Sequence, residues 1–87
     1  MKVHFTKRFK RKYKKLDAPY QNIVDDTLAL LLQDFQAKSL RNKKVQGHPG
    51  IREISGNMDI RITFEIEKPD MIVLRNCGHH DDVLRNP

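Results

Sequence analysis

Two adjacent histidines in the last part of the chain, and two arginines before them, are residue types that transfer protons and bind phosphate. His79 and His80 follow one another, and Arg61 and Arg75 precede them. Imidazole titrates near neutral pH and serves as a general acid or base. Guanidinium groups donate paired hydrogen bonds to phosphate oxygens. With the carboxylate of Asp59, this set suits cleavage of an RNA phosphodiester by its own 2′-hydroxyl, a reaction that needs a base, a cation and an acid.

Two lysines add positive charge to this group of residues, and its histidines also raise the question of a metal site. Lys43 and Lys44 can stabilise the charge that develops on a cleaved phosphate. The segment His79–His80–Asp81–Asp82 also resembles a metal-binding cluster, but no third ligand is spaced to complete it, so we expect no metal. We expect no other cofactor. His48 could line the same site, but its place in a Gly-rich loop favours a solvated histidine.

Net charge and its distribution favour a polyanionic partner. The 87 residues carry 17 Lys and Arg against 11 Asp and Glu, a formal charge of +6. Residues 1–15 hold eight basic and no acidic residues. Residues 16–37 hold aspartates but no lysine or arginine, and residues 38–52 are basic again. A small domain charged in this way is typical of proteins that bind nucleic acid. We predict two basic surfaces separated by a neutral or acidic helix.

The N-terminal half predicts a short strand and two helices. Val3 and Phe5 alternate with polar residues, as in an edge strand. Thr6 is placed to cap a first helix, whose apolar stripe at helical spacing is Phe5, Phe9, Tyr13 and Leu16. Asp17 or Ala18 can cap a second helix over about 19–36, with Pro19 in its first turn. The short link between the two helices predicts an antiparallel hairpin.

The second half predicts a small antiparallel sheet. Residues 58–66 alternate strictly, with apolar side chains on one face and Asp59, Arg61, Thr63 and Glu65 on the other. Residues 51–55 and 71–75 have the composition of shorter strands, 39–50 that of a loop, and 76–87 that of a tail. The fold class is α+β, with the N-terminal strand and the helix hairpin packed on one face of the sheet.

The register of the last two strands decides where Arg75 lies. If Ile66 pairs with Met71, Arg75 faces Ile62 on the core side. One more residue in the connection places Arg75 opposite Thr63, beside Arg61 on the open face. Burying an unpaired guanidinium is costly, so we predict the second register and two arginines that converge on one phosphate.

Length, cysteine content and hydropathy limit the function further. The 87 residues suffice for one domain, 1–87. Cys77 is the sole cysteine, which excludes a disulfide framework and is typical of the cytosol. No apolar run is long enough to span a membrane, and the basic N-terminal segment lacks the features of a signal peptide. We therefore expect a cytoplasmic protein that does not insert into membranes.

The order of these motifs resembles the RelE/StbE (YafQ-like) branch of the RelE/ParE toxin superfamily. The residues that carry the resemblance are the helix Phe9-Lys10-Arg11-Lys12-Tyr13-Lys14-Lys15-Leu16, the segment Ser39 to Gly47, the strand Met58-Asp59-Ile60-Arg61-Ile62-Thr63-Phe64 and the ending Gly78-His79-His80. The similarity covers nearly the whole chain. Ile60, Ser55 and Leu84 differ from residues that are common in this branch.

The resemblance implies the toxin of a type II toxin–antitoxin pair, a ribosome-dependent endonuclease that cleaves mRNA in the A site. It implies His80 as acid or base, Arg61 and Arg75 on the phosphate, Asp59 as the strand carboxylate and Lys43 as a charge stabiliser, with His79 as a possible substitute for His80. It implies contacts to ribosomal RNA from Lys10, Arg11, Lys14, Arg41 and Lys44. A cognate antitoxin would block the toxin, and the complex would bind operator DNA.

Two other functions remain open at the level of the sequence. A ParE-like protein would inhibit DNA gyrase and cleave no RNA, but it would not need the histidines and arginines described above. A non-catalytic RNA-binding protein or an inactive toxin relative would use the basic segments alone. Such a protein would hold RNA mainly through phosphates, and its binding would fall steeply with salt.

Overall fold

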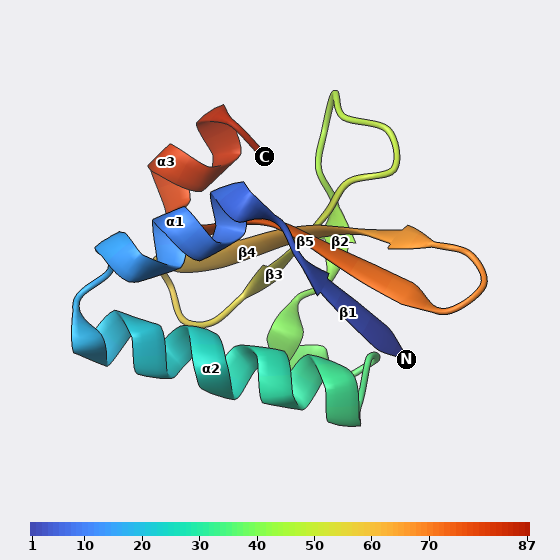
Figure 1. Ribbon diagram of the computed structural model, residues 1–87, viewed down its shortest axis with the longest axis horizontal. Coiled ribbons are helices and arrows are strands. Elements are labelled where there is room, and N and C mark those ends of the chain that lie inside the picture. Colours follow the sequence, from blue (N-terminus) through green and yellow to red (C-terminus); the bar gives the residue numbers. More distant parts are fainter.

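The structure is a computed structural model of residues 1–87, and it is an α+β domain built on one five-stranded sheet (Figure 1). The strand order is β1-β5-β4-β3-β2. The elements along the chain are β1 (Lys2–Phe5), α1 (Lys7–Lys15), α2 (Ala18–Gln33), the 3₁₀ turn η1 (Lys38–Leu40), β2 (Lys43–Lys44), β3 (Arg52–Ser55), β4 (Ile60–Glu67), β5 (Met71–His79) and α3 (His80–Arg85). None of the helices combines the length and the apolar character that crossing a membrane requires.

The two N-terminal helices form the predicted antiparallel pair. Thr6 caps α1, since its hydroxyl oxygen accepts a hydrogen bond from the Phe9 N–H at 3.1 Å. Asp17 is the N-cap of α2, and Pro19 lies in the first turn. Between the helices, the Gln21 amide donates to the Tyr13 carbonyl at 2.9 Å. The second helix ends at Gln33, before the predicted end, because the backbone of Asp34 leaves the helical conformation.

The core lies between the sheet and these helices. The apolar face of β4, with Ile60, Ile62 and Phe64 fully buried, packs with Val24 and Leu31 of α2. Phe9 of α1 is also a member of this cluster. The alternation therefore predicted correctly that Ile60, Ile62 and Phe64 face the core. It was wrong at both ends of the predicted strand, because β4 begins only at Ile60, and the side chains of Met58 and Ile66 are exposed. The other face of β4, which we call the open face, carries Arg61, Thr63 and Glu65.

Three predictions about the sheet and its helices were wrong. The sheet is mixed, because β1 pairs in parallel with β5. Lys43 and Lys44, predicted in a loop, form β2 and pair with Arg52 and Glu53. Residues 76–87 are not a loose tail, because β5 continues to His79 and α3 follows.

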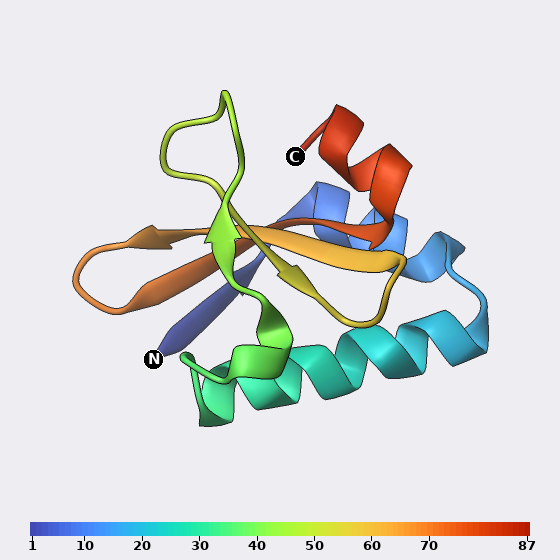
Figure 2. The same ribbon diagram turned by 180° about the vertical axis from the view of Figure 1, so that it is seen from behind.

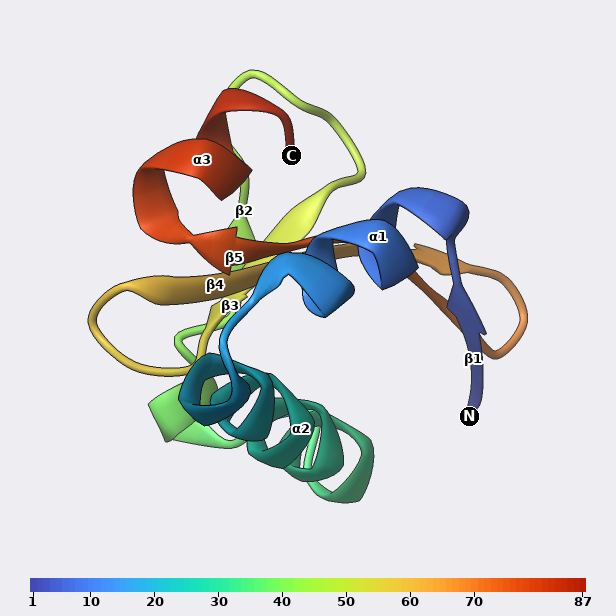
Figure 3. The same ribbon diagram turned by 60° about the vertical axis from the view of Figure 1, so that its left-hand side comes forward.

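The helix α3 lies on the side of the sheet away from α2 (Figures 1 and 3). The helices therefore lie on both faces of the sheet, whereas the sequence predicted helices on one face only. Val83 is fully buried beneath α3. A Cβ atom on Gly78 would lie 3.5 Å from the Val83 side chain, and Gly78 has a positive φ of +148°. That distance is an ordinary contact, so the positive φ, which other residues rarely adopt, is what favours glycine at this position.

The predicted register holds only at the turn between β4 and β5. Ile66 pairs with Ile72 and Phe64 with Leu74, but the register then shifts and Thr63 pairs with Asn76. Arg75 is the extra residue of this bulge, so it does not face Thr63 as predicted. A bulge redirects the side chain of the inserted residue, and this one separates the surroundings of Arg75 from those of Arg61.

Removing the cap of α1 should destabilise the fold. The Thr6 hydroxyl also donates to the Leu74 carbonyl at 2.7 Å, which ties α1 to β5. We expect Thr6→Ala to lower the free energy of unfolding by about 1–2 kcal/mol, measured by urea denaturation. Thr6→Ser keeps both hydrogen bonds and is the control. An unchanged unfolding midpoint in Thr6→Ala would contradict this role of the cap.

Candidate active site

A buried carboxylate lies between two cations on the open face. The Glu53 side chain of β3 is 5 % exposed, and its Oε1 lies 3.9 Å from Arg61 Nε and 3.8 Å from Lys43 Nζ. Because Lys43 pairs with Glu53 and Ser55 with Arg61 across the strands, all four residues share this face. The Arg61 guanidinium, 12 % exposed, also donates to the carbonyls of Asn57 and Ile60. These contacts fix the side chains of Glu53 and Arg61 in place.

Asp59 holds both histidines at the end of β5. One of its oxygens lies 2.5 Å from His79 Nδ1, and the other accepts the His80 backbone N–H at 3.1 Å. The His79 ring packs edge-on against Tyr20 of α2, with ring centroids 4.9 Å apart. His79 pairs with the core residue Ile60, so it lies on the helix side of the sheet. His80 lies beyond the strand and begins α3, on the side of the sheet away from α2 (Figure 1).

The charge state of Asp59 follows from these contacts. The hydrogen bonds from the His79 ring and then from the His80 N–H lower the pKa of the Asp59 carboxyl below its usual value. Asp59 is therefore an anion at neutral pH, suited to orient imidazole groups. The His80 ring is held only by Asp81, whose side chain is 92 % exposed, at 3.0 Å. His80 thus keeps more freedom to exchange protons with a ligand than His79 does.

The remaining predicted catalytic residue, Arg75, lies apart from this group. Its Nη1 donates to Glu65 at 3.0 Å, whereas Arg61 turns back toward Asn57. Arg61 and Glu65 are four residues apart on one strand, about 13 Å along β4. The Arg75 guanidinium contacts Glu65 and the Pro87 oxygen, whereas that of Arg61 contacts Glu53 and two main-chain carbonyls. The two groups share no partner, so the predicted convergence of both on one phosphate is not seen in the structure.

The basic residues predicted to hold RNA lie in two separate regions. Lys10, Arg11 and Lys14 are exposed along α1, whereas Arg41 and Lys44 are exposed at η1 and β2. The strand order places β2 at the far edge from β1 and β5, against which α1 packs. Figures 1 and 2 show α1 and β2 from opposite sides. The two predicted basic surfaces therefore exist, but not as one continuous patch.

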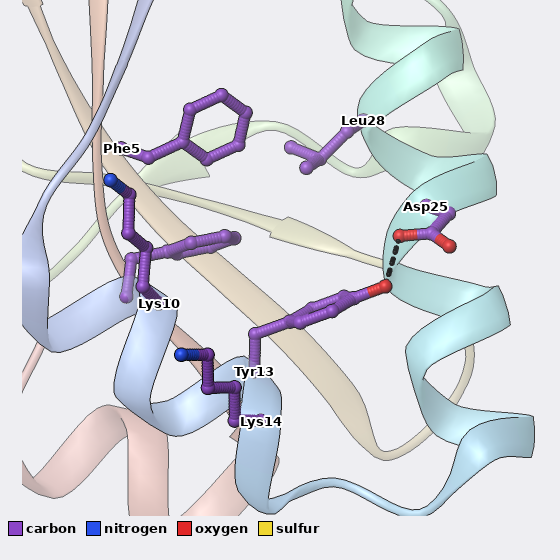
Figure 4. Close-up of a pocket in the computed structure, with 7 residues that line it drawn as sticks. Phe5, Lys10, Tyr13, Lys14, Asp25 and Leu28 are labelled. Carbon is purple, nitrogen blue, oxygen red and sulfur yellow. Dashed lines mark hydrogen bonds between the residues drawn. The ribbon is translucent and has the colours of Figure 1, made fainter.

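An apolar crevice opens between α1 and α2 (Figure 4). Its volume is about 250 Å³, and its lining is Phe5, Phe9, Lys10, Tyr13, Lys14, Asp25 and Leu28. The Tyr13 hydroxyl donates to Asp25 at 2.8 Å across it. That hydrogen bond, followed by desolvation, raises the pKa of Tyr13. Phe5 and Leu32 leave a large part of their side chains exposed beside the crevice, so this part of the surface is apolar, in contrast to the charged open face.

Sequence reasoning missed Glu53. The segment 51–55 was expected to be a strand, but it is too short for its sequence pattern to show which side chains face the core. The charge on Glu53 also argued against a buried position. The pairing of β3 with β4 resolves this, because Glu53 pairs with Thr63 and shares the face of Arg61. Its sequence neighbours, Arg52 and Ile54, gave no local signal of a buried carboxylate.

The arrangement supplies the groups needed for cleavage by an internal hydroxyl. Glu53 is a carboxylate that can accept a proton, Arg61 and Lys43 are cations, and His80 is a proton donor on the same face. No three side chains of His, Cys, Asp or Glu gather into a metal-binding cluster. Burial raises the pKa of the Cys77 thiol to about 12, so this thiol is a poor nucleophile.

Comparisons with known proteins give the fold and nothing closer. No protein-family model matches the chain, and no curated protein is similar to it. Among solved structures, YafQ from E. coli matches with 12 % identity and a TM-score of 0.77 over 93 % of this chain and 94 % of that one. The RelB–RelE antitoxin–toxin complex from Methanococcus jannaschii matches with 20 % identity and a TM-score of 0.75, over 98 % and 100 %. The chain has the fold of the RelE/YafQ-like toxin superfamily.

Proposed function

We propose that this chain is the toxin of a type II toxin–antitoxin pair and cleaves mRNA by metal-independent attack of the 2′-hydroxyl, on the ribosome. The observation that supports the proposal is the row of Lys43, Glu53 and Arg61 on the open face, together with His80, whose backbone N–H is held by Asp59, two residues before Arg61. Lys43 and Arg61 offset the cost of burying the Glu53 carboxylate, and they place a proton acceptor directly beside two groups that can bind a phosphate.

The roles follow from position and charge. Glu53 takes the proton of the 2′-hydroxyl, and Arg61 with Lys43 stabilises the negative charge on the phosphorane. His80 donates a proton to the 5′-oxygen leaving group. His79 and Asp59 are positioning residues, since Asp59 holds the backbone of His80 and the ring of His79 together. Arg75 takes no part in this group.

The cognate partner in this proposal is an antitoxin. The structures with this fold include the E. coli DinJ–YafQ toxin–antitoxin complex, which matches with 13 % identity and a TM-score of 0.77 over 93 % of each chain. The apolar crevice between α1 and α2 gives such a partner an apolar surface, and Lys10 and Lys14 on its rim would attract acidic side chains. Operator DNA would be bound only by the toxin–antitoxin complex, and the site of action would be the cytoplasm.

The proposal is tested by primer extension on an mRNA in a purified translation reaction, with and without ribosomes. Ribosome-dependent breaks in the mRNA are expected. An intact mRNA with normal translation would overturn the endonuclease. A supercoiling assay with DNA gyrase would then decide whether the protein is a ParE-like inhibitor, and a filter-binding assay whether it only binds RNA.

The basic face of α1 should contribute affinity without chemistry. We expect the double variant Lys10→Ala, Lys14→Ala to bind ribosomes more weakly and to reduce the slope of log K against log salt by about 2, one for each lost phosphate contact. Cosedimentation at several salt concentrations measures this. The control is Lys2→Ala, Lys68→Ala, which removes two exposed lysines outside this helix. Equal slopes in the two double variants would contradict the assignment.

A further inference from the structure

Three donors converge on one main-chain oxygen at the end of the described chain. The Pro87 oxygen accepts hydrogen bonds from Thr63 Oγ1 at 2.8 Å, Arg8 Nη2 at 2.9 Å and Arg75 Nε at 3.3 Å. These donors come from β4, α1 and β5. Thr63 is fully buried, so its hydroxyl is fixed in direction. The oxygen is therefore held in a built site formed by elements that are distant in sequence.

One of the two cations of this site has no protein carboxylate as a partner. Arg75 pairs with Glu65 at 3.0 Å, but Arg8 forms no ion pair, and its other hydrogen bond goes to the Arg75 carbonyl at 3.0 Å. Both guanidinium groups donate to the Pro87 oxygen, and desolvation followed by the charge of Arg75 lowers the pKa of Arg8. Two cations directed at one oxygen favour an oxyanion, since charge-assisted hydrogen bonds are about twice as strong as neutral ones.

We propose that Arg8, Arg75 and Thr63 form a phosphate-binding subsite, and that the Pro87 oxygen occupies it in this structure, so that the C-terminal segment and a phosphate compete for it. The inference deepens the proposed function, because Thr63 lies two residues from Arg61 on the same face, about 7 Å along β4. A strand of RNA whose scissile phosphate lies at Arg61 would reach this subsite with a neighbouring phosphate.

The competing segment, residues 86–87, has further anchors besides the Pro87 oxygen. The Asn76 side chain donates to the Asn86 carbonyl at 2.9 Å, the Asn86 N–H donates to the Val83 carbonyl at 3.2 Å, and Pro87 is buried. The rest of α3 is held independently by the buried Val83. Residues 86–87 can therefore leave the subsite without removing α3 from the sheet. Only molecules in which residues 86–87 have left the subsite can bind phosphate there. The apparent Kd for phosphate is therefore the intrinsic Kd divided by the fraction of molecules with a free subsite.

The test compares the full chain with a shortened chain that lacks Asn86 and Pro87. Isothermal titration with inorganic phosphate, and separately with a short oligoribonucleotide, measures the affinity. We expect the shortened chain to bind each of them at least about tenfold more tightly. Arg8→Gln in the shortened chain should remove this gain. Arg85→Gln, an exposed arginine on α3, is the matched control and should keep the gain.

A second variant guards against misfolding of the shortened chain. Asn76→Ala in the full chain removes the donor to Asn86 and should also increase the affinity for phosphate. Equal affinities in the full chain, the shortened chain and Asn76→Ala, with native circular dichroism, would overturn the inference. Tighter binding of the oligoribonucleotide or of free phosphate supports the inference. Comparing the two titrations tells whether the subsite requires a nucleic-acid backbone. None of these readouts depends on cleavage, so the subsite and the endonuclease can fail separately.

Discussion

His80→Ala is expected to lower the rate of mRNA cleavage on the ribosome by about 10²–10⁴-fold, the usual contribution of a general acid. His80 is the histidine on the side of Arg61, and its ring is held only by a solvent-exposed carboxylate. Ribosome binding should remain almost unchanged, because His80 makes no contact that maintains either basic region. Primer extension gives the cleavage rate, and cosedimentation gives the binding.

Two further histidine variants make this result specific. His48→Ala removes an exposed histidine from the loop between β2 and β3 and should leave cleavage unchanged. His79→Ala should lower cleavage less than His80→Ala, since His79 acts through Asp59 on the placement of His80. Full activity in His80→Ala, or an equal loss of ribosome binding, would contradict its role as the acid.

Glu53→Gln is expected to lower cleavage by about 10²–10³-fold while leaving the protein folded. The amide keeps the size of the side chain but removes the group that accepts a proton, and it leaves Arg61 and Lys43 without their shared anion. Loss of a buried charge partner also costs stability. The thermal unfolding midpoint should therefore fall as well, and the cleavage rate must be measured well below that midpoint.

Glu65→Gln is the matched control for this variant. Glu65 also lies on the open face of β4 and also pairs with an arginine, but that arginine is Arg75, outside the proposed catalytic group. Its cleavage rate should stay close to that of the unmodified protein. Equal losses in the two variants would show that the open face tolerates no change of charge, and Glu53 would then lose its assignment as the base.

The sequence determined some parts of this fold more strongly than others. The strict alternation over 58–66 predicted the core face and the open face of β4, because a strand with one buried face has a period of two. The cap at Thr6 and the proline after Asp17 marked the helix starts, because each acts through local hydrogen bonds or a fixed φ.

The errors arose where distant contacts decide the structure. A strand of only two residues, Lys43–Lys44, carries no periodic signal, and it exists because β3 lies beside it. The bulge at Arg75 depends on the whole ladder of β4 and β5. Glu53 was missed for the same reason, since its face is set by its pairing with Thr63. Residue types thus indicated the chemistry, but the pairing of strands selected which residues belong to the site.

The parallel pairing of β1 with β5 has a consequence for the order of events during synthesis. Thr6 and Leu74 are 68 positions apart in the chain, yet they share a hydrogen bond. At about 5–20 residues per second, roughly 3–14 seconds pass between the synthesis of these two residues. Until β5 emerges, β1 has no neighbour, and Arg61 and His80 are not yet on one surface. If the chain has the proposed activity, a nascent chain cannot attack the message that encodes it, because the proposed catalytic groups assemble only after β5 has been made.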